Sequence, residues 1–167
     1  PQGFEESRAP GAAPSRCYQQ VTCSCFSASI NRPSGAYGDN TMFSHVMVGV
    51  NDLEVSKVFY DALLGTLGVP PGVANKNRYF YRGPHGTFCI TTPINGEPAT
   101  FANGGTIGFA MQSPEQADAF HAAGVAHGGT TCEDPPGWRE GPGGRLYLAY
   151  VRDPDGNKLC ALHRPPK

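Results

Sequence analysis

The feature that most limits the possible fold is a pattern that occurs twice within residues 42–167: a short strand, a helix and then further strands. The first copy covers residues 42–92 and the second covers residues 105–167, with a linker at 93–104 between them. Each copy would present a short twisted sheet with one helix on one face, which is too little to close a hydrophobic core alone. The sequence therefore predicts an α+β fold in which two βαβββ modules pair, within one chain or across a dimer. The pair would form a curved mixed sheet around a cup, with the helices on the outside.

The first copy has clear strand and helix signals. Apolar residues alternate along the strand predicted at 43–50, which puts its valines on one face. The helix after it starts at residues 51–54, which have the spacing of a capping box, and ends at Gly68, before two prolines. Two further strands are predicted at 78–82 and 86–92. The helix residues expected to be buried are Val55, Val58, Phe59, Ala62, Leu63 and Leu67.

The second copy repeats these signals with different residues. A strand at 105–112 leads to Ser113, which starts a helix in a second capping box. We expect Gly124 to end this helix, and residues 134–144 to form a Gly- and Pro-rich loop. The remaining strands are predicted at 130–133, 146–152 and 158–163, and a tight turn joins the last two.

The composition excludes several classes of protein. The formal net charge is −1 and only 16% of the residues are charged, so the chain lacks the surplus of Lys and Arg that nucleic-acid binders use. No stretch approaches the roughly 20 apolar residues that cross a membrane. Cys23 and Cys25 are too close together for a CxxC motif, and six cysteines are few for a disulfide scaffold. We therefore expect a cytoplasmic protein whose partner is a small molecule rather than nucleic acid or a membrane.

Residues 1–41 differ in composition from the rest of the chain. They are rich in Pro, Gly, Ser, Ala and Arg, and they lack the period of a helix or of an extended strand. The first methionine is Met42, directly before the first predicted strand. We therefore expect residues 1–41 to be a disordered leader, an expression-derived segment or read-through sequence, and residues 42–167 to be the folded domain.

Two stretches of the folded part carry a family resemblance. The first is FSHVMVGV at 43–50, followed by NDLEVSKVFYDALLGTLG at 51–68, and the second is RDPDGNKLCALHR at 152–164. Together with the doubled pattern, they make residues 42–165 resemble the vicinal oxygen chelate (VOC) superfamily: glyoxalase I, bleomycin- and fosfomycin-resistance proteins and extradiol dioxygenases. The resemblance implies a small-molecule site in the cup. It also implies a homodimer, because related proteins commonly exchange modules between subunits.

The resemblance also implies positions for a metal site. Metal-dependent members hold the ion with a His on the first strand, carboxylates on the fourth and last strands, and a His or Gln at the start of the second half. These positions fall on His45, Cys89, Cys160 and Thr106, so only the histidine matches. One imidazole and two thiolates suit Zn²⁺, and one prediction is therefore a divalent ion at His45, Cys89 and Cys160. The alternative is that the cysteines are buried as small apolar side chains and that the metal site is lost.

Other side chains are candidates for contact with a ligand. His45 is the predicted catalytic residue, and the alternative is a histidine that only makes hydrogen bonds inside a polar cavity. The tyrosines among the candidates lie on strands, where they either line the cup or pack in the core. The Trp–Arg pair lies in the predicted loop, where the arginine would hold a carboxylate or phosphate; otherwise both are exposed loop residues. The predicted substrate-binding residues are Tyr79, Tyr81, Trp138, Arg139 and Tyr147.

Two classes of function follow from these residues. The first is a lyase- or isomerase-type enzyme that acts on a small oxygenated or electrophilic molecule. Ordinary glyoxalase I or extradiol dioxygenase activity is not expected, because the carboxylate ligands are absent. The second is a protein that binds and sequesters an antibiotic or metabolite without chemistry, as the bleomycin-resistance members imply. Metal bound to the purified protein would favour the enzyme.

Overall fold

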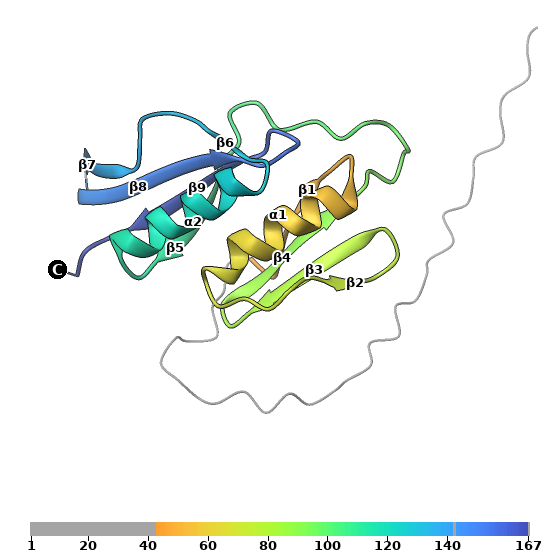
Figure 1. Cartoon of the computed structure of the whole chain (residues 1–167), viewed down its shortest axis with the longest axis horizontal. Coiled ribbons are helices and arrows are strands. Elements are labelled where there is room, and N and C mark those ends of the chain that lie inside the picture. The colour runs from red at the N-terminus through yellow and green to blue at the C-terminus, as the bar shows by residue number, and fades with distance from the viewer. Residues whose placement is uncertain (1–42, 142, 167) are drawn as a thin grey trace, which may run out of the picture. The chain divides into compact units, whose positions relative to one another are not determined.

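The structure, a computed structural model, describes residues 43–141 and 143–166 (Figure 1). The predicted α+β class and the two modules are confirmed; module one has the predicted βαβββ order, and module two has one further strand. The predictions for residues 1–41 lie outside the described residues. Module one consists of β1 (His45–Gly49), α1 (Leu53–Gly65), β2 (Val73–Ala74), β3 (Arg78–Gly83) and β4 (Gly86–Thr91). Module two consists of β5 (Ile107–Met111), α2 (Pro114–Ala126), β6 (Thr130–Thr131), β7 (Gly137–Gly141), β8 (Gly144–Arg152) and β9 (Lys158–His163).

Each module forms its own mixed sheet. The first has the strand order β1-β4-β3-β2 and the second β5-β9-β8-β6, and β7 also pairs with β8. In each sheet the first strand runs parallel to the last strand of its module, β1 beside β4 and β5 beside β9. Helices α1 and α2 pack against each other and cover the same side of the two sheets (Figure 1). Within the described residues no ladder joins the sheets, so β1 and β5 are both edge strands that border the junction between the modules.

Helix α1 shows why a sequence pattern can misplace a buried face. Asp52, within the helix start predicted at residues 51–54, caps the helix by accepting hydrogen bonds from the backbone N–H groups of Glu54 and Val55. The predicted buried stripe is wrong in part, because Val55 and Val58 are 50% and 58% exposed. The buried face is rotated, and two of its members carry hydroxyl groups that the pattern counts as polar. The buried residues of α1 are Ser56, Phe59, Tyr60, Leu63 and Leu64.

Helix α2 does not end where its sequence predicts. The helix continues past Gly124 to Ala126. Gly124 is buried, and a Cβ atom placed there would lie 3.1 Å from the side chains of Leu63 and Val151. The glycine therefore permits a close approach between the modules rather than a helix stop.

Two short strands were missed in the sequence. Strand β2 pairs with β3 after the two prolines, and strand β7 lies inside the segment 134–144 that was predicted to be a loop. Both lie at the edge of their sheets, where pairing with one neighbour suffices. Both segments are short and lie among Gly and Pro residues, so they show no strand pattern in the sequence. Whether such short segments become strands depends on the partner strand.

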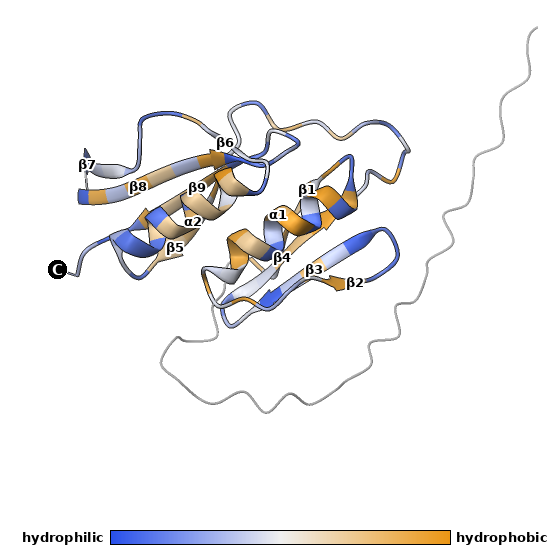
Figure 2. Cartoon of the chain, in the orientation of Figure 1, coloured by the Kyte–Doolittle hydropathy of each residue, from blue (hydrophilic) through white to orange (hydrophobic). Residues whose placement is uncertain are grey.

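Aromatic rings connect the cores of the two modules. The ring of Phe88 lies 4.9 Å from that of Tyr60 in module one and 5.7 Å from that of Phe109 in module two. Phe109 continues the chain to Phe120 of α2, at 5.4 Å between centroids. Hydrophobic colour marks much of α1, β8 and β9, whereas β3 is hydrophilic at both ends (Figure 2).

A polar network also holds the modules together. The turn between β8 and β9 carries Asp153, which accepts a hydrogen bond of 2.7 Å from the hydroxyl of Tyr60 on α1. Asp155 in the same turn accepts one of 3.1 Å from the hydroxyl of Ser56. The side-chain amide of Asn157 donates to the backbone oxygen of Gly49 at 3.1 Å. These partners explain why the hydroxyl groups of α1 are buried, since buried polar groups need hydrogen bonds.

No helix of the described residues is long and apolar enough to cross a membrane.

Candidate functional site

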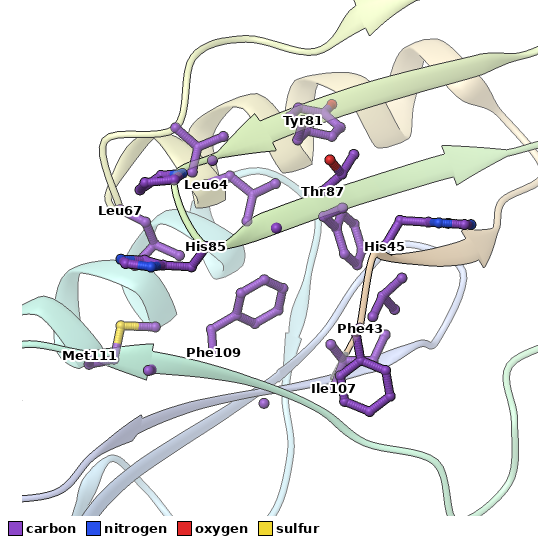
Figure 3. A pocket seen from close by; sticks show the side chains of 18 of the residues that line it. Phe43, His45, Leu64, Leu67, Tyr81, His85, Thr87, Ile107, Phe109 and Met111 are labelled. Atoms are coloured by element: carbon purple, nitrogen blue, oxygen red, sulfur yellow. The ribbon is translucent and has the colours of Figure 1, made fainter. Parts of the chain in front are cut away.

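The candidate site is a groove of about 660 Å³ at the junction of the modules. Strands β1 and β4 form one wall and strand β5 forms the other (Figure 3). Twenty of the described residues line the groove, and none of these is Asp, Glu, Lys or Arg. The apolar lining residues with the largest side chains are Phe43, Leu64, Leu67, Phe88, Ile107, Phe109 and Met111. The groove therefore offers a mostly apolar surface of the size that accommodates a small molecule.

Local sequence explains the shape of the β5 wall. Gly108 and Ala110 have no bulk, and a Cβ atom at Gly108 would meet nothing within 4 Å. Phe109 lies between them in the sequence and on the other face of the strand, where it packs on Phe88, and both rings also line the groove. The two small residues thus leave room along β5, while Phe109 anchors the strand to the core.

The two histidines of the groove lie at opposite ends of it, with Phe109 between them (Figure 3). His45 lies beside Thr87 in the β1–β4 ladder, is exposed, and its Nδ1 lies 3.0 Å from the hydroxyl oxygen of Ser44. The sequence predicted His45 as a site residue and indicated no ligand role for His85. His85 reaches the groove because it lies in the tight turn between β3 and β4, and no sequence signal shows where that turn points.

The residues at the implied metal positions do not form a metal site in the described part of the chain. Cys89 is fully buried in the middle of its sheet, between Met47 and Phe80 on the neighbouring strands. Cys160 lies in the other sheet, opposite Tyr150. Among the described residues no three His, Cys, Asp or Glu side chains come together, so the donors do not fit the implied ion.

The environment of the two thiols also disfavours metal binding. Burial raises the pKa of Cys89, and the positive charges of Arg82 and Arg78 only partly oppose it. Burial raises the pKa of Cys160 as well, against the hydrogen bond with Tyr150. Since a metal binds the thiolate, a raised pKa weakens both residues as ligands.

The two tyrosines predicted on β3 face helix α1. The hydroxyl of Tyr79 donates a hydrogen bond of 2.7 Å to Glu54 of the helix. Tyr81 is buried, its hydroxyl lies 3.5 Å from the backbone oxygen of Lys57, and burial raises its pKa. Of the two, only Tyr81 lines the groove.

The three candidates of module two form a separate cluster away from the groove. The rings of Trp138 and Tyr147 pack edge to face at 5.4 Å between centroids. Tyr147 donates to Asp118 of α2 at 2.7 Å. Arg139 donates to the backbone oxygens of Pro135, at 2.6 Å, and Trp138. The structure therefore does not bring these side chains together with His45.

Comparison with known proteins agrees with this fold. Residues 42–161 match the model of the Glyoxalase/Bleomycin resistance protein/Dioxygenase superfamily. A crystal structure of a glyoxalase/bleomycin resistance protein from Albidiferax ferrireducens T118 is 80% identical and has a TM-score of 0.72, covering 74% of this chain and 99% of its own.

More distant structures share the fold alone. A putative glyoxalase from Bacillus halodurans is 24% identical with a TM-score of 0.61, over 74% of this chain and 96% of its own. A glyoxalase-related enzyme from Fulvimarina pelagi is 22% identical with a TM-score of 0.58, over 74% and 88%. No curated protein matches the chain. The family match and the similarity to the A. ferrireducens protein show that this chain belongs to the Glyoxalase/Bleomycin resistance protein/Dioxygenase superfamily, as its sequence predicted.

Proposed function

We propose that the chain binds a small, mainly apolar molecule in the groove between its modules, without a metal ion. The observation that carries this proposal is the lining, which combines aromatic and aliphatic side chains and contains no charged Asp, Glu, Lys or Arg. An apolar ligand gains roughly 25 cal/mol for each Å² of surface that it removes from water. A charged ligand group would lose its hydration there without finding a partner of opposite charge. The groove therefore favours an uncharged, flat molecule.

A few polar groups would orient such a ligand. Thr87 lies on the β4 wall, and Gln112 follows β5 at the other side. Gln116 also lines the groove, but its side chain is engaged with the backbone of Gln112 and Thr66. This division between a large apolar surface and few polar groups is typical of small-molecule sites.

The test is a titration with the neutral fluorescent probe 1-aminoanthracene. The wild type should show saturable binding at one site per chain. The variant Ala110→Phe fills the groove from an exposed position of β5, and should weaken binding by about tenfold or more, the loss of about 1.4 kcal/mol. The control Ala74→Phe introduces the same ring at an exposed strand position outside the groove, and should bind as the wild type does. Equal losses in both variants, or no saturable binding to the wild type, would contradict the proposal.

A lyase- or isomerase-type enzyme is the second candidate. The observation that favours it is His45, whose Nε2 has no hydrogen-bond partner among the described residues and which lies at one end of the groove. Such an imidazole is able to remove a proton from a carbon atom of a bound carbonyl compound. Exchange of that proton for deuterium, followed by NMR in D2O over a panel of small hydroxycarbonyl compounds, would reveal this step. His45→Gln should abolish the exchange and His85→Gln should retain it; exchange that survives His45→Gln would exclude the role of His45.

We also retain the homodimer as a proposal. Strands β1 and β5 each leave one edge without a strand partner within the described residues, and such edges favour association. Light scattering at micromolar concentration should give twice the chain mass of 17.7 kDa. A monomer mass would contradict the proposal.

A cytoplasmic location is proposed on the state of the cysteines. Cys89, Cys132 and Cys160, the cysteines of the described residues, are all free. Reduced thiols are usual in the cytoplasm and uncommon in secreted proteins. Fractionation of the native host, with detection by a specific antibody, would test the location.

A further inference from the structure

Two arginines without a carboxylate partner among the described residues lie on the sheet of module one (β1-β4-β3-β2). They are on the face that α1 does not cover. Arg78 and Arg82 lie on β3 with Phe80 between them, and alternation along the strand puts all three on the same face. Neither guanidinium group forms an ion pair within the described residues. The Nε atom of Arg78 is buried and has no hydrogen-bond acceptor there. Since buried donors are nearly always satisfied, the unpaired N–H shows that the described residues do not use the hydrogen-bonding capacity of Arg78.

The two arginines flank the middle of this face. Phe80 lies between them on β3, and Cys89 of β4 lies opposite Phe80 in the ladder. Arg82 lies over the ring of Phe80, with its Cζ 5.1 Å from the centroid. The positive charge therefore borders a central apolar region of the face.

The same face has an apolar floor and no acidic residue. Met47 and Phe80 flank the buried Cys89 on the two neighbouring strands, and both are partly exposed. Strands β1 to β4 contain neither Asp nor Glu. Thr87 and Thr91 lie opposite Arg82 and Arg78 in the β4 ladder and add hydroxyl groups to the face. The surface thus combines positive charge, hydrogen-bond donors and a flat apolar patch.

We propose that this face is a binding site for a small aromatic carboxylate, whose anionic group is held by Arg78 and Arg82 and whose ring lies on Phe80 and Met47. Guanidinium groups match carboxylates in charge and in hydrogen-bond geometry. The site goes beyond the groove proposed above, whose lining contains no arginine and favours an uncharged ligand. The two sites meet at Thr87, so a single ligand that spans both would carry its anionic group on the β3 side.

The test uses benzoate as the probe and benzamide as its uncharged counterpart. In ¹H–¹⁵N spectra of the full chain, benzoate should shift the side-chain Nε–H signals of Arg78 and Arg82, and benzamide should not. Arg82→Met keeps the apolar stem of an exposed side chain, and should weaken benzoate binding by about tenfold. Arg78→Met should weaken it by a similar factor, and Arg78→Lys should restore part of the loss, because lysine keeps the charge but not the planar fork.

The matched control is Arg145→Met in module two. Arg145 also lies on a strand and over an aromatic ring, that of Trp138, but it is paired with Glu140. Its replacement should leave benzoate binding unchanged. Benzoate binding that is unaffected by Arg82→Met, or reduced equally by Arg145→Met, would overturn the proposal. Ala110→Phe separates the two sites: it should weaken binding of 1-aminoanthracene in the groove by about tenfold or more and leave the Arg78 and Arg82 shifts with benzoate intact.

Discussion

The two modules have a similar order of helix and strands, but their positively charged side chains differ in their partners. In module two, Arg139 lies 3.7 Å from Asp134, Arg145 lies 3.8 Å from Glu140, and Lys158 is paired with Glu133. In module one, the two arginines of β3 have no such partner within the described residues. Arg152 of β8 is an exception in module two, since it donates to the backbone oxygen of Gly156 and forms no ion pair within the described residues. The same topology therefore produces one sheet in which most cations are paired with carboxylates and one in which, among the described residues, the arginines are not.

This difference shows where the function of such a fold is encoded. Strand alternation and helix capping are similar in both modules, and they depend on apolar residues that face the helices. The exposed sheet faces depend on the other half of the strand residues, which the core does not constrain. Membership of the superfamily thus accounts for the scaffold, and the face residues decide the ligand.

The largest expected effect concerns the contact that makes the two modules one unit. Asp153→Ala removes the acceptor of the Tyr60 hydroxyl and of the backbone and side-chain N–H groups of Asn157. Because these donors would stay buried without a partner, the free energy of unfolding should fall by about 3 kcal/mol or more. Urea unfolding measures this loss. The control Asp134→Ala removes an exposed partner of Arg139 and should change stability little; equal effects would mean that the turn does not join the modules.

The next prediction concerns a variant that gives the arginines of module one a carboxylate partner, like those of module two. Thr87→Glu places a carboxylate opposite Arg82 on the ladder of module one. The new ion pair should compete with benzoate and lower its affinity by about tenfold. Thr130→Glu makes the same change opposite Arg152 in module two and should leave benzoate affinity unchanged. An unchanged affinity for Thr87→Glu, measured by NMR titration, would show that the acceptor site lies elsewhere.

A smaller effect is expected from the pH dependence of stability. Burial raises the pKa of Asp153, and the hydrogen bonds from Asn157 and Tyr60 only partly oppose this. The folded state therefore holds the proton more tightly than the unfolded chain, whose carboxyl pKa is about 3.9. The contribution of Asp153 to stability is greatest below that value and declines as pH rises through the folded pKa. From acidic to neutral pH, the free energy of unfolding of the wild type should therefore fall relative to that of Asp153→Asn. Parallel pH curves for the two proteins would contradict this prediction.

The smallest expected effect is on zinc binding. His45, Cys89 and Cys160 do not form a cluster within the described residues, so the wild type, His45→Ala and Cys160→Ser should bind Zn²⁺ equally weakly. Competitive titration of the reduced proteins against a chelating dye measures this. A clear loss of affinity in either variant would restore the metal site that the resemblance implied.

Particular residues show how far the sequence predicts this structure. Ser113 starts α2 as predicted, and α1 starts within the predicted residues 51–54, because a cap depends on residues two or three positions away. Tyr60 and Gly124 were misjudged, because the burial of the first depends on Asp153 and the packing of the second on Leu63, both distant in sequence. The residues of the candidate site likewise fall into those that the sequence predicts and those that only the structure reveals. His45 was found from strand alternation and resemblance, whereas Phe109 and His85 joined the groove only through the packing of modules and the direction of a turn.

The sequence by itself determined the α+β class, the two modules, the superfamily and the position of His45 on the face opposite to the valines of β1. These properties depend on local spacing, since the alternation of a strand and the cap of a helix are complete within a few residues. Only the tertiary structure decided, for the described residues, that no Asp, Glu, Lys or Arg lines the groove, that the predicted metal positions form no cluster of three ligands, and that the arginines of β3 form no ion pair. Each of these depends on which distant segments pack together, and a one-dimensional pattern does not contain that information.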